Sequence, residues 1–207
     1  MYRSDSRGQP NTIYIVGARG VGKTSLLNVI LGRGYNENIR HSRVGITTSN
    51  YKLKDRDLII KELTDDDNFS QTKILKNQLE EVILIIVVFA IDNEDSLEYA
   101  KSLVSFIESN ITYNKGIQIV LFGNKYDSKT NNPKIKVNQI EADNYASDWD
   151  NCTYFDFSCK TGFNMEKIEE LMKEISENCT NVDKDDFETE DSGGMNNNQE
   201  SNSCILF

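Results

Sequence analysis

The chain carries one glycine-rich stretch that ends in a lysine and a threonine, Gly17-Ala18-Arg19-Gly20-Val21-Gly22-Lys23-Thr24. An apolar run precedes it at residues 13–16, and an amphipathic segment follows it at residues 25–30. In a turn between a strand and a helix, glycines allow successive backbone N–H groups to point into one concavity that holds phosphate groups. Lys23 adds a positive charge there, and the Thr24 hydroxyl suits a magnesium ion. The stretch therefore predicts a P-loop that binds a nucleoside di- or triphosphate.

The length and charge of the chain narrow the classes of protein to consider. Its 207 residues are enough for one domain with a substantial core. The formal net charge of −10 disfavours nucleic acid as a partner. The four cysteines form neither a CxxC pair nor a dense framework, which is typical of reduced thiols in a cytosolic protein. We therefore expect a cytoplasmic protein that does not bind nucleic acid, and we also expect a monomer.

Apolar and amphipathic segments alternate along the chain. Strands are predicted at residues 13–16, 51–53, 58–63, 82–90, 117–122 and 153–157. Helices are predicted after the P-loop, at residues 70–81, 95–110 and 138–149, and in a last segment with Ile168, Leu171, Met172 and Ile175 on one face. Residues 32–49 and 65–69 are predicted to be connecting loops. The alternation predicts an α/β fold, a three-layer P-loop NTPase domain whose mostly parallel six-stranded sheet has helices on both faces.

The two ends of the chain differ from the middle in composition. Residues 1–10 are polar and are predicted to be a flexible N-terminus. Residues 11–179 form the predicted domain. Residues 180–207 hold seven acids against one base, Lys184, with many serines, asparagines and glycines. Such a segment buries too little apolar surface to fold, so we predict a disordered acidic tail.

A second motif, Asn124-Lys125-Tyr126-Asp127, directly follows a predicted buried strand. A carboxylate at Asp127 can accept hydrogen bonds from N1–H and the 2-amino group of guanine, and adenine offers neither donor. Asn124 can brace the loop or touch the base, and the stem of Lys125 can cover the ring. Ser158-Cys159-Lys160, after the next strand, is placed to close the pocket from the other side. The three motifs together predict a site for guanine nucleotides.

These motifs resemble those of the Ras superfamily of small GTPases, over roughly residues 11–179. Val44-Gly45-Ile46 and Asp92-Asn93-Glu94-Asp95-Ser96-Leu97 look like Rab segments, so Rab is the first choice and Ras- or Rho-like membership stays open. The resemblance implies binding of GTP or GDP with Mg²⁺, which Thr24 would ligate. The residues that it assigns to the nucleotide are Gly17, Arg19, Gly20, Val21, Gly22, Lys23, Thr24, Ser25, Tyr35, Asn124, Lys125, Asp127, Ser158, Cys159 and Lys160. Tyr35 is either an aromatic contact to the base or an exposed loop tyrosine.

Two departures from the family pattern lie near the expected γ-phosphate. Arg19 stands where the family usually has glycine. It either crowds the space of the catalytic water, points to solvent, or acts as an arginine finger from within the chain. Arg43 stands where a loop threonine normally ligates Mg²⁺, and arginine cannot coordinate a cation. Either Ser42 replaces that threonine, or the loop does not close on Mg²⁺ in the usual way.

A third departure lies in the family's DxxGQ motif. Aligning the third strand puts Glu62 at the aspartate, Asp65 at the glycine and Asp66 at the catalytic glutamine. A shift by one residue would put Leu63 at the aspartate and Asp67 at the glutamine. In either register the glutamine is absent, and a carboxylate cannot donate the hydrogen bond that an amide gives. No catalytic residue is therefore assigned beyond Asp66 at the usual glutamine position, with Arg19 and Glu62 nearby. We expect slow GTP hydrolysis, and the acidic cluster could favour GDP over GTP.

The chain ends in Cys204-Ile205-Leu206-Phe207, which fits a C-a-a-X motif for geranylgeranylation of Cys204. One prenyl chain gives only reversible membrane binding, so we expect a prenyltransferase and a prenyl-binding chaperone as partners. Effectors and an exchange factor are expected to bind residues 32–49 and 65–69. The prediction is a membrane-trafficking switch on the cytosolic face of membranes. The alternatives are a GTP-bound scaffold that recruits effectors without turnover and, less favoured, an ATP-binding P-loop protein.

Overall fold

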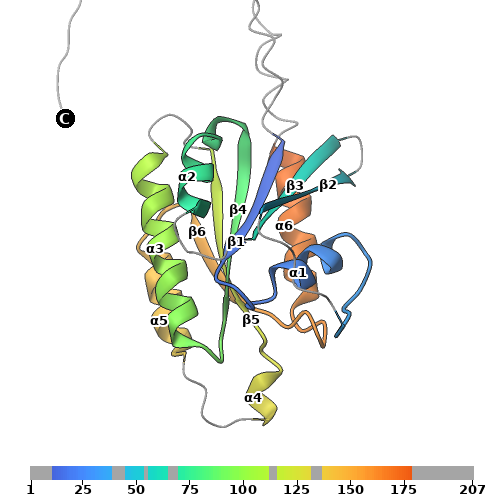
Figure 1. Cartoon of the computed structure of the whole chain (residues 1–207), viewed down its shortest axis with the longest axis vertical. Coiled ribbons are helices and arrows are strands. Elements are labelled where there is room, and N and C mark those ends of the chain that lie inside the picture. Colours follow the sequence, from blue (N-terminus) through green and yellow to red (C-terminus); the bar gives the residue numbers. More distant parts are fainter. Residues whose placement is uncertain are drawn as a thin grey trace, which may run out of the picture.

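The computed structural model describes residues 11–38, 45–53, 56–64, 70–111, 116–131 and 137–178. Its centre is a six-stranded sheet with the strand order β2-β3-β1-β4-β5-β6 (Figure 1). The strands are β1 (Thr12–Gly17), β2 (Gly45–Leu53), β3 (Arg56–Thr64), β4 (Val82–Ala90), β5 (Gln118–Asn124) and β6 (Cys152–Asp156). The helices are α1 (Lys23–Ile30), α2 (Ser70–Lys76), α3 (Glu94–Asn110), α4 (Ser128–Asn131), α5 (Gln139–Ser147) and α6 (Met165–Asn178), with a short 3₁₀ turn at Leu79–Glu81.

All strand pairs are parallel except one. β1 pairs in parallel with β3 and β4, and β5 pairs in parallel with β4 and β6, whereas β2 runs antiparallel to β3. A sheet of this kind needs cover on both faces, and its inner strands are long apolar runs. β1 is buried along its whole length and β4 at every position but one. The predicted α/β fold, with its mostly parallel six-stranded sheet, is confirmed.

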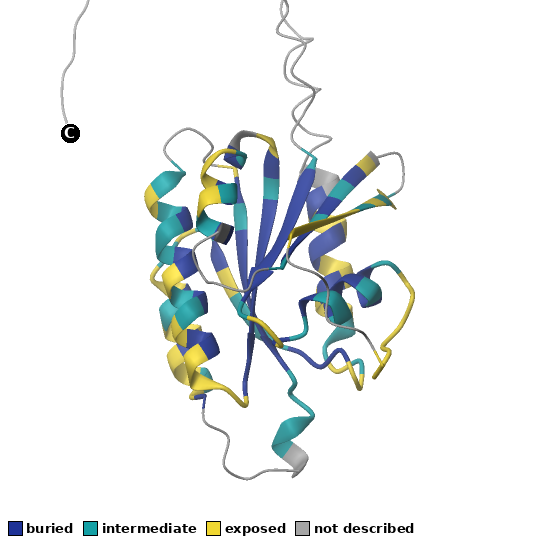
Figure 2. Cartoon of the chain, viewed as in Figure 1, coloured by how far each residue is buried: buried dark blue, intermediate teal, exposed yellow. Residues whose placement is uncertain are grey.

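Two apolar layers cover the sheet. Helices α2, α3 and α5 lie on one face, and α1 and α6 lie on the other (Figure 1). Alternate residues of one strand serve the two layers: Tyr14 and Val16 face α3, whereas Ile13 and Ile15 face α1 and α6. The outer faces of the helices and of the edge strand β2 are exposed (Figure 2). None of the described helices is both long enough and apolar enough to cross a membrane.

Asparagine side chains fix the starts of two helices. The side chain of Asn93 accepts a hydrogen bond from the backbone N–H of Ser96 at the start of α3. Asn138 does the same for Ile140 at the start of α5. Each bond satisfies an N–H that has no partner within the helix. The boundary of α3 also sets the position of Asp92, just before it, which lines the candidate site.

Some predicted boundaries were wrong. Residues 45–49 were predicted as loop but form the start of β2, and β3 begins two residues earlier than predicted, at Arg56. The apolar pattern of β2 is weak because most of this edge strand is exposed. The helix predicted at residues 70–81 is divided into α2 and the 3₁₀ turn, and the short helix α4 was not predicted. The predicted N-terminus and tail lie outside the described residues.

Candidate nucleotide-binding site

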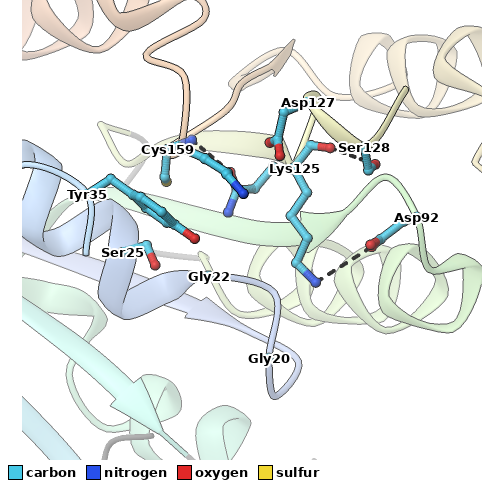
Figure 3. A pocket seen from close by; sticks show the side chains of 11 residues that line it. Gly20, Gly22, Ser25, Tyr35, Asp92, Lys125, Asp127, Ser128 and Cys159 are labelled. Carbon is cyan, nitrogen blue, oxygen red and sulfur yellow. Dashed lines mark hydrogen bonds and ion pairs between the residues drawn. The ribbon is translucent and has the colours of Figure 1, made fainter. Parts of the chain in front are cut away.

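The carboxyl ends of the parallel strands gather the predicted site residues at one edge of the sheet, where ligands bind in open α/β folds. A cavity of about 310 Å³ opens there between the loops that follow β1, β5 and β6 (Figure 3). It is lined by Gly20, Gly22, Ser25, Tyr35, Asp92, Asn124, Lys125, Asp127, Ser128, Cys159 and Lys160. Nine of these were predicted from the sequence; Asp92 and Ser128 were not assigned to the nucleotide. Residues more than a hundred positions apart thus form one pocket.

The P-loop folds around the amino group of Lys23. This buried lysine donates hydrogen bonds from Nζ to the carbonyl oxygens of Gly17 at 2.9 Å and Ala18 at 2.8 Å. The bonds hold its charge at the mouth of the loop, next to the amino end of α1. A helix amino end carries unpaired N–H groups and a partial positive charge, which favours phosphate. Arg19 is exposed on the same loop, and the buried side chain of Val21 belongs to the core under α1.

Gly22 allows the P-loop to approach the base-binding loop closely. Its φ of +101° lies in the left-handed region, and a Cβ atom there would stand 2.1 Å from Nδ2 of Asn124. Asn124 Nδ2 donates to the carbonyl of Val21 at 2.8 Å, and its Oδ1 accepts from the N–H of Cys159 at 3.2 Å. Asn124 was predicted either to brace the loop or to touch the base. In the structure its side chain braces the loop, because it bonds to the loops that hold Val21 and Cys159.

The predicted guanine-recognition residue, Asp127, is oriented by a neighbouring loop. Its Oδ1 accepts a hydrogen bond from Ser158 Oγ at 2.6 Å. Ser158 therefore holds the carboxylate rather than lining the cavity itself. Tyr126 stacks on Phe163, with ring centroids 4.1 Å apart, and this contact ties the same two loops together. An oriented carboxylate can accept two hydrogen bonds in the plane of a base.

Three further side chains surround the cavity. Lys125 has a left-handed φ of +67°, and its Nζ lies 3.6 Å from Oδ1 of Asp92 (Figure 3). Tyr35 projects into the same space from the segment after α1 (Figure 3). Lys160, which also lines the cavity, forms an exposed ion pair with Glu37 at 3.2 Å. The ion pair and Tyr35 connect the segment after α1 to the loop after β6.

Cys159 occupies the middle of the Ser-Cys-Lys motif and is buried. Burial raises the pKa of its thiol to about 12. The side chain is therefore a neutral thiol at physiological pH and supplies shape and apolar surface to the pocket wall. The thiolate is the reactive form of cysteine, so the Cys159 side chain is unreactive at physiological pH.

Glu62 lies under the P-loop, at the end of β3. Thr24 Oγ1 donates to its Oε1 at 2.5 Å, and its buried Oε2 has no hydrogen-bond partner among the described residues. Burial raises the pKa of this carboxyl, against the lowering effects of the Thr24 hydrogen bond and the Lys23 charge. A hydroxyl, a carboxylate with an unused oxygen and nearby phosphates are the partners that Mg²⁺ uses at nucleotide sites. These residues therefore fit the predicted cation.

The two alternative alignments of β3 with the family motif put either Glu62 or Leu63 at the aspartate, and these two side chains lie on opposite faces of the sheet. Leu58, Ile60 and Glu62 point toward α1, whereas Leu63 is buried in the layer of α2 and α3. Strand side chains alternate between faces, so a shift by one residue would move Leu63 to the P-loop and Glu62 away from it. Among the described residues of β3, Glu62 is therefore the side chain that contacts the P-loop, and its alignment with the family's aspartate stays a prediction. Ser42, Asp65, Asp66, Asp67 and Cys204 lie outside the described residues.

Besides Ser128, two polar residues near the site were missed in the sequence, Gln71 and Asp92. Gln71, in α2, forms two hydrogen bonds to the backbone of Gly17. Asp92 was noted only as part of a Rab-like segment. No local motif marks either residue, because each contact depends on elements that meet only in the folded chain.

A P-loop joined to a base-binding loop at the carboxyl edge of a parallel sheet defines a P-loop nucleotide-binding protein. Comparison with known families identifies the group: a family model described as the Ras family matches residues 12–178. The chain belongs to this family and is a small GTP-binding protein of the Ras superfamily. The family as a whole binds guanine nucleotide with Mg²⁺. A comparison with curated proteins found no match.

Proposed function

We propose that the protein is a guanine-nucleotide switch in membrane traffic that hydrolyses GTP slowly. The observation that supports slow hydrolysis is the hydrogen bond from Thr24 to Glu62. It supports the register in which Asp66 stands at the position of the catalytic glutamine. An amide there donates one hydrogen bond and accepts another, whereas a carboxylate only accepts and also repels phosphate. The chain would then bind GTP well without orienting the attacking water efficiently.

The side chains at the site divide the work of binding. Lys23 and the N–H groups of the P-loop would hold the phosphates, and Asp127 would select guanine. Thr24 and Glu62 would hold Mg²⁺, which when bound neutralises phosphate charge. Asn124 keeps the two halves of the site together.

A role in traffic is supported by the Rab-like segments and by an exposed edge strand. Gly45 and Ile46 lie at the start of β2, and Ile46 has 45% of its surface exposed. Effectors and an exchange factor would use this strand and the neighbouring residues 32–49 and 65–69. An unpaired strand edge with an exposed apolar side chain is a common docking surface for proteins.

The competing proposal is a scaffold that binds GTP and recruits effectors without turnover. Arg19 favours it, because this exposed arginine stands in the loop where the family usually has glycine. Its side chain could exclude both the attacking water and an arginine supplied by a partner.

The release of γ-phosphate from GTP-loaded protein in a single turnover separates the two proposals. A slow but measurable rate, which increases when Asp66→Gln restores the amide, is expected for the switch. Asp67→Gln is the matched control, because it makes the same chemical change at the neighbouring acid and should leave the rate unchanged. No release from the native chain or from Asp66→Gln would favour the scaffold. A native rate equal to that of ordinary family members would refute slow hydrolysis.

Membrane attachment is proposed to depend on prenylation of Cys204, with the help of a prenyltransferase and a prenyl-binding chaperone. The native chain should divide between cytosol and membranes, because a single lipid chain binds reversibly. Cys204→Ser should move the protein to the cytosol, whereas Cys179→Ser should leave its distribution unchanged. An unchanged membrane fraction in Cys204→Ser would contradict the lipid anchor.

A further inference from the structure

Gln71 is a buried polar side chain that has no role in the nucleotide binding proposed above. It lies near the start of α2, with 2% of its surface exposed. Its Oε1 accepts from the backbone N–H of Gly17 at 3.0 Å, and its Nε2 donates to the carbonyl oxygen of Gly17 at 3.0 Å. One side chain of α2 thus satisfies both backbone groups of the first P-loop residue.

The two hydrogen bonds act on Gly17 beyond the point where β1 stops pairing with β3. The pairing of β1 with β3 ends at Ile15 and Glu62, two residues before Gly17. Residues two apart in a strand direct their backbone groups to the same side. A carboxamide carries the same donor and acceptor as a peptide bond. The Gln71 side chain therefore bonds the backbone N–H and carbonyl of Gly17, a residue outside the β1–β3 pairing.

The carbonyl of Gly17 also connects Gln71 to the phosphate-binding lysine. It accepts from Gln71 Nε2 on one side and from Lys23 Nζ, at 2.9 Å, on the other. A Cβ atom at Gly17 would stand 2.0 Å from the carbonyl oxygen of Val88 in β4, so the residue is held on that side too. A displacement of α2 must therefore either break the pair of hydrogen bonds or move the group that orients Lys23.

We propose that Gln71 is a positioning residue that couples α2 to the phosphate site. It fixes the Gly17 carbonyl and through it the amino group of Lys23, so that the position of α2 and the grip on the phosphates change together. The helix follows directly on residues 65–69, the segment in which the proposed function puts Asp66 at the glutamine position. The inference rests on the guanine-nucleotide binding that the proposed function also requires.

Gln71→Met tests the coupling, because methionine keeps the length of the side chain and removes both hydrogen-bonding groups. Release of a fluorescent GDP analogue should become about tenfold faster, the usual size of a coupling between two sites. The phosphorus resonance of the β-phosphate of bound GDP should also shift. Gln71→Glu should accelerate release at least as much, because a carboxylate cannot donate to the Gly17 carbonyl.

Leu75→Ala is the matched control. Leu75 is fully buried in the same helix and packs only in the apolar layer of α2 and α3. This variant should lower the melting temperature while its GDP release stays within about twofold of the native rate and its phosphorus spectrum stays native, as expected for a site without shared partners. Native release and a native spectrum in Gln71→Met, or an equal acceleration in Leu75→Ala, would overturn the proposal. Failure of the native chain to bind GDP would instead refute the proposed function.

Hydrogen exchange on the native chain gives a second test that requires no substitution. The N–H of Gly17 should exchange in the same opening event as the N–H groups of α2, because its acceptor is a side chain of that helix. Equal exchange free energies for Gly17 and Leu75 in the GDP-bound chain are expected. A Gly17 N–H that stays protected while α2 exchanges freely would show that the two are not coupled.

Discussion

Glu62 is a carboxyl whose surroundings act against its charge until a cation is bound. Burial raises its pKa, although Thr24 and Lys23 favour the ionised form. A carboxyl with a higher pKa in the folded chain than in the unfolded chain opposes folding above that pKa. The opposition disappears as the pH falls and the group becomes protonated. Glu62 therefore costs stability at neutral pH, and a nearby Mg²⁺ would reverse the balance.

Glu62→Gln should separate these two effects. Without nucleotide and Mg²⁺, the variant should melt at a higher temperature than the native chain at pH 7.5, and the difference should shrink as the pH falls toward the ordinary pKa of glutamate. With GDP, Mg²⁺ should slow nucleotide release from the native chain but hardly from the variant, with a difference of about tenfold or more. Thermal unfolding across pH and release with and without EDTA measure the two effects. A lower melting temperature without Mg²⁺ at every pH would contradict the burial argument.

The P-loop and the base-binding loop meet where a glycine lies against an amide. Gly22 at the start of α1 leaves room for Asn124 at the end of β5, and Asn124 reaches on to Cys159 after β6. The Asn124 side chain thus links the loops that follow three strands, and it can do so because Gly22 has no Cβ atom. The preorganisation of these loops lowers the entropy that a bound nucleotide would otherwise have to overcome.

Gly22→Ala should disrupt this junction. The new Cβ would lie 2.1 Å from Asn124 Nδ2, so the amide must move and lose its hydrogen bond to Val21. We expect GDP affinity to fall by about a hundredfold, the effect of losing a buried hydrogen bond and adding strain of about 3 kcal/mol in all. Gly32→Ala is the control, because Gly32 also has a positive φ, +69°, but an open surrounding. Equal affinity losses in both variants, measured by calorimetry, would mean that backbone strain rather than the junction is responsible.

The sequence predicts those parts of the site that local spacing determines. The P-loop and the Asn-Lys-Tyr-Asp motif are contiguous segments at strand ends, so the residue types alone indicate their chemistry. Gln71 could not be found in this way, because its partner Gly17 is 54 positions away and its helix has no motif. Asp92 is likewise brought to Lys125 by the pairing of Ala90 with Asn124 across two parallel strands.

The strand boundaries near β2 show a second limit of sequence reading. An edge strand has one open side, and β2 has little buried surface. Only its last five residues show a weak alternation of half-buried and exposed positions. Its pairing partner β3 is recognisable because Leu58, Ile60 and Leu63 are buried. The position of β2 is thus determined by β3 and not by its own sequence.

In the molecule as a whole, several strands of the sheet, and not one element, contribute loops to the candidate site. β1, β5 and β6 each end in a loop that reaches the cavity, and the two apolar layers pack against opposite faces of the same strands. A guanine nucleotide would therefore bridge segments from both halves of the chain. Such a ligand stabilises the folded state, because the unfolded chain offers no assembled site. The free energy gained grows with the logarithm of the ligand concentration divided by its dissociation constant.

Unfolding should accordingly depend strongly on the base of the added nucleotide. With Mg²⁺ and GDP at about a thousand times the dissociation constant, the folded state should gain roughly 4 kcal/mol, which raises the melting temperature by roughly 10 °C for a domain of this size. ADP at the same concentration should give a much smaller shift, because adenine offers no donors to Asp127. In Asp127→Ala the advantage of GDP over ADP should disappear, while both nucleotides keep the contribution of the P-loop. Equal shifts with GDP and ADP in the native chain would place recognition in the phosphate loop alone and remove the assigned role of Asp127.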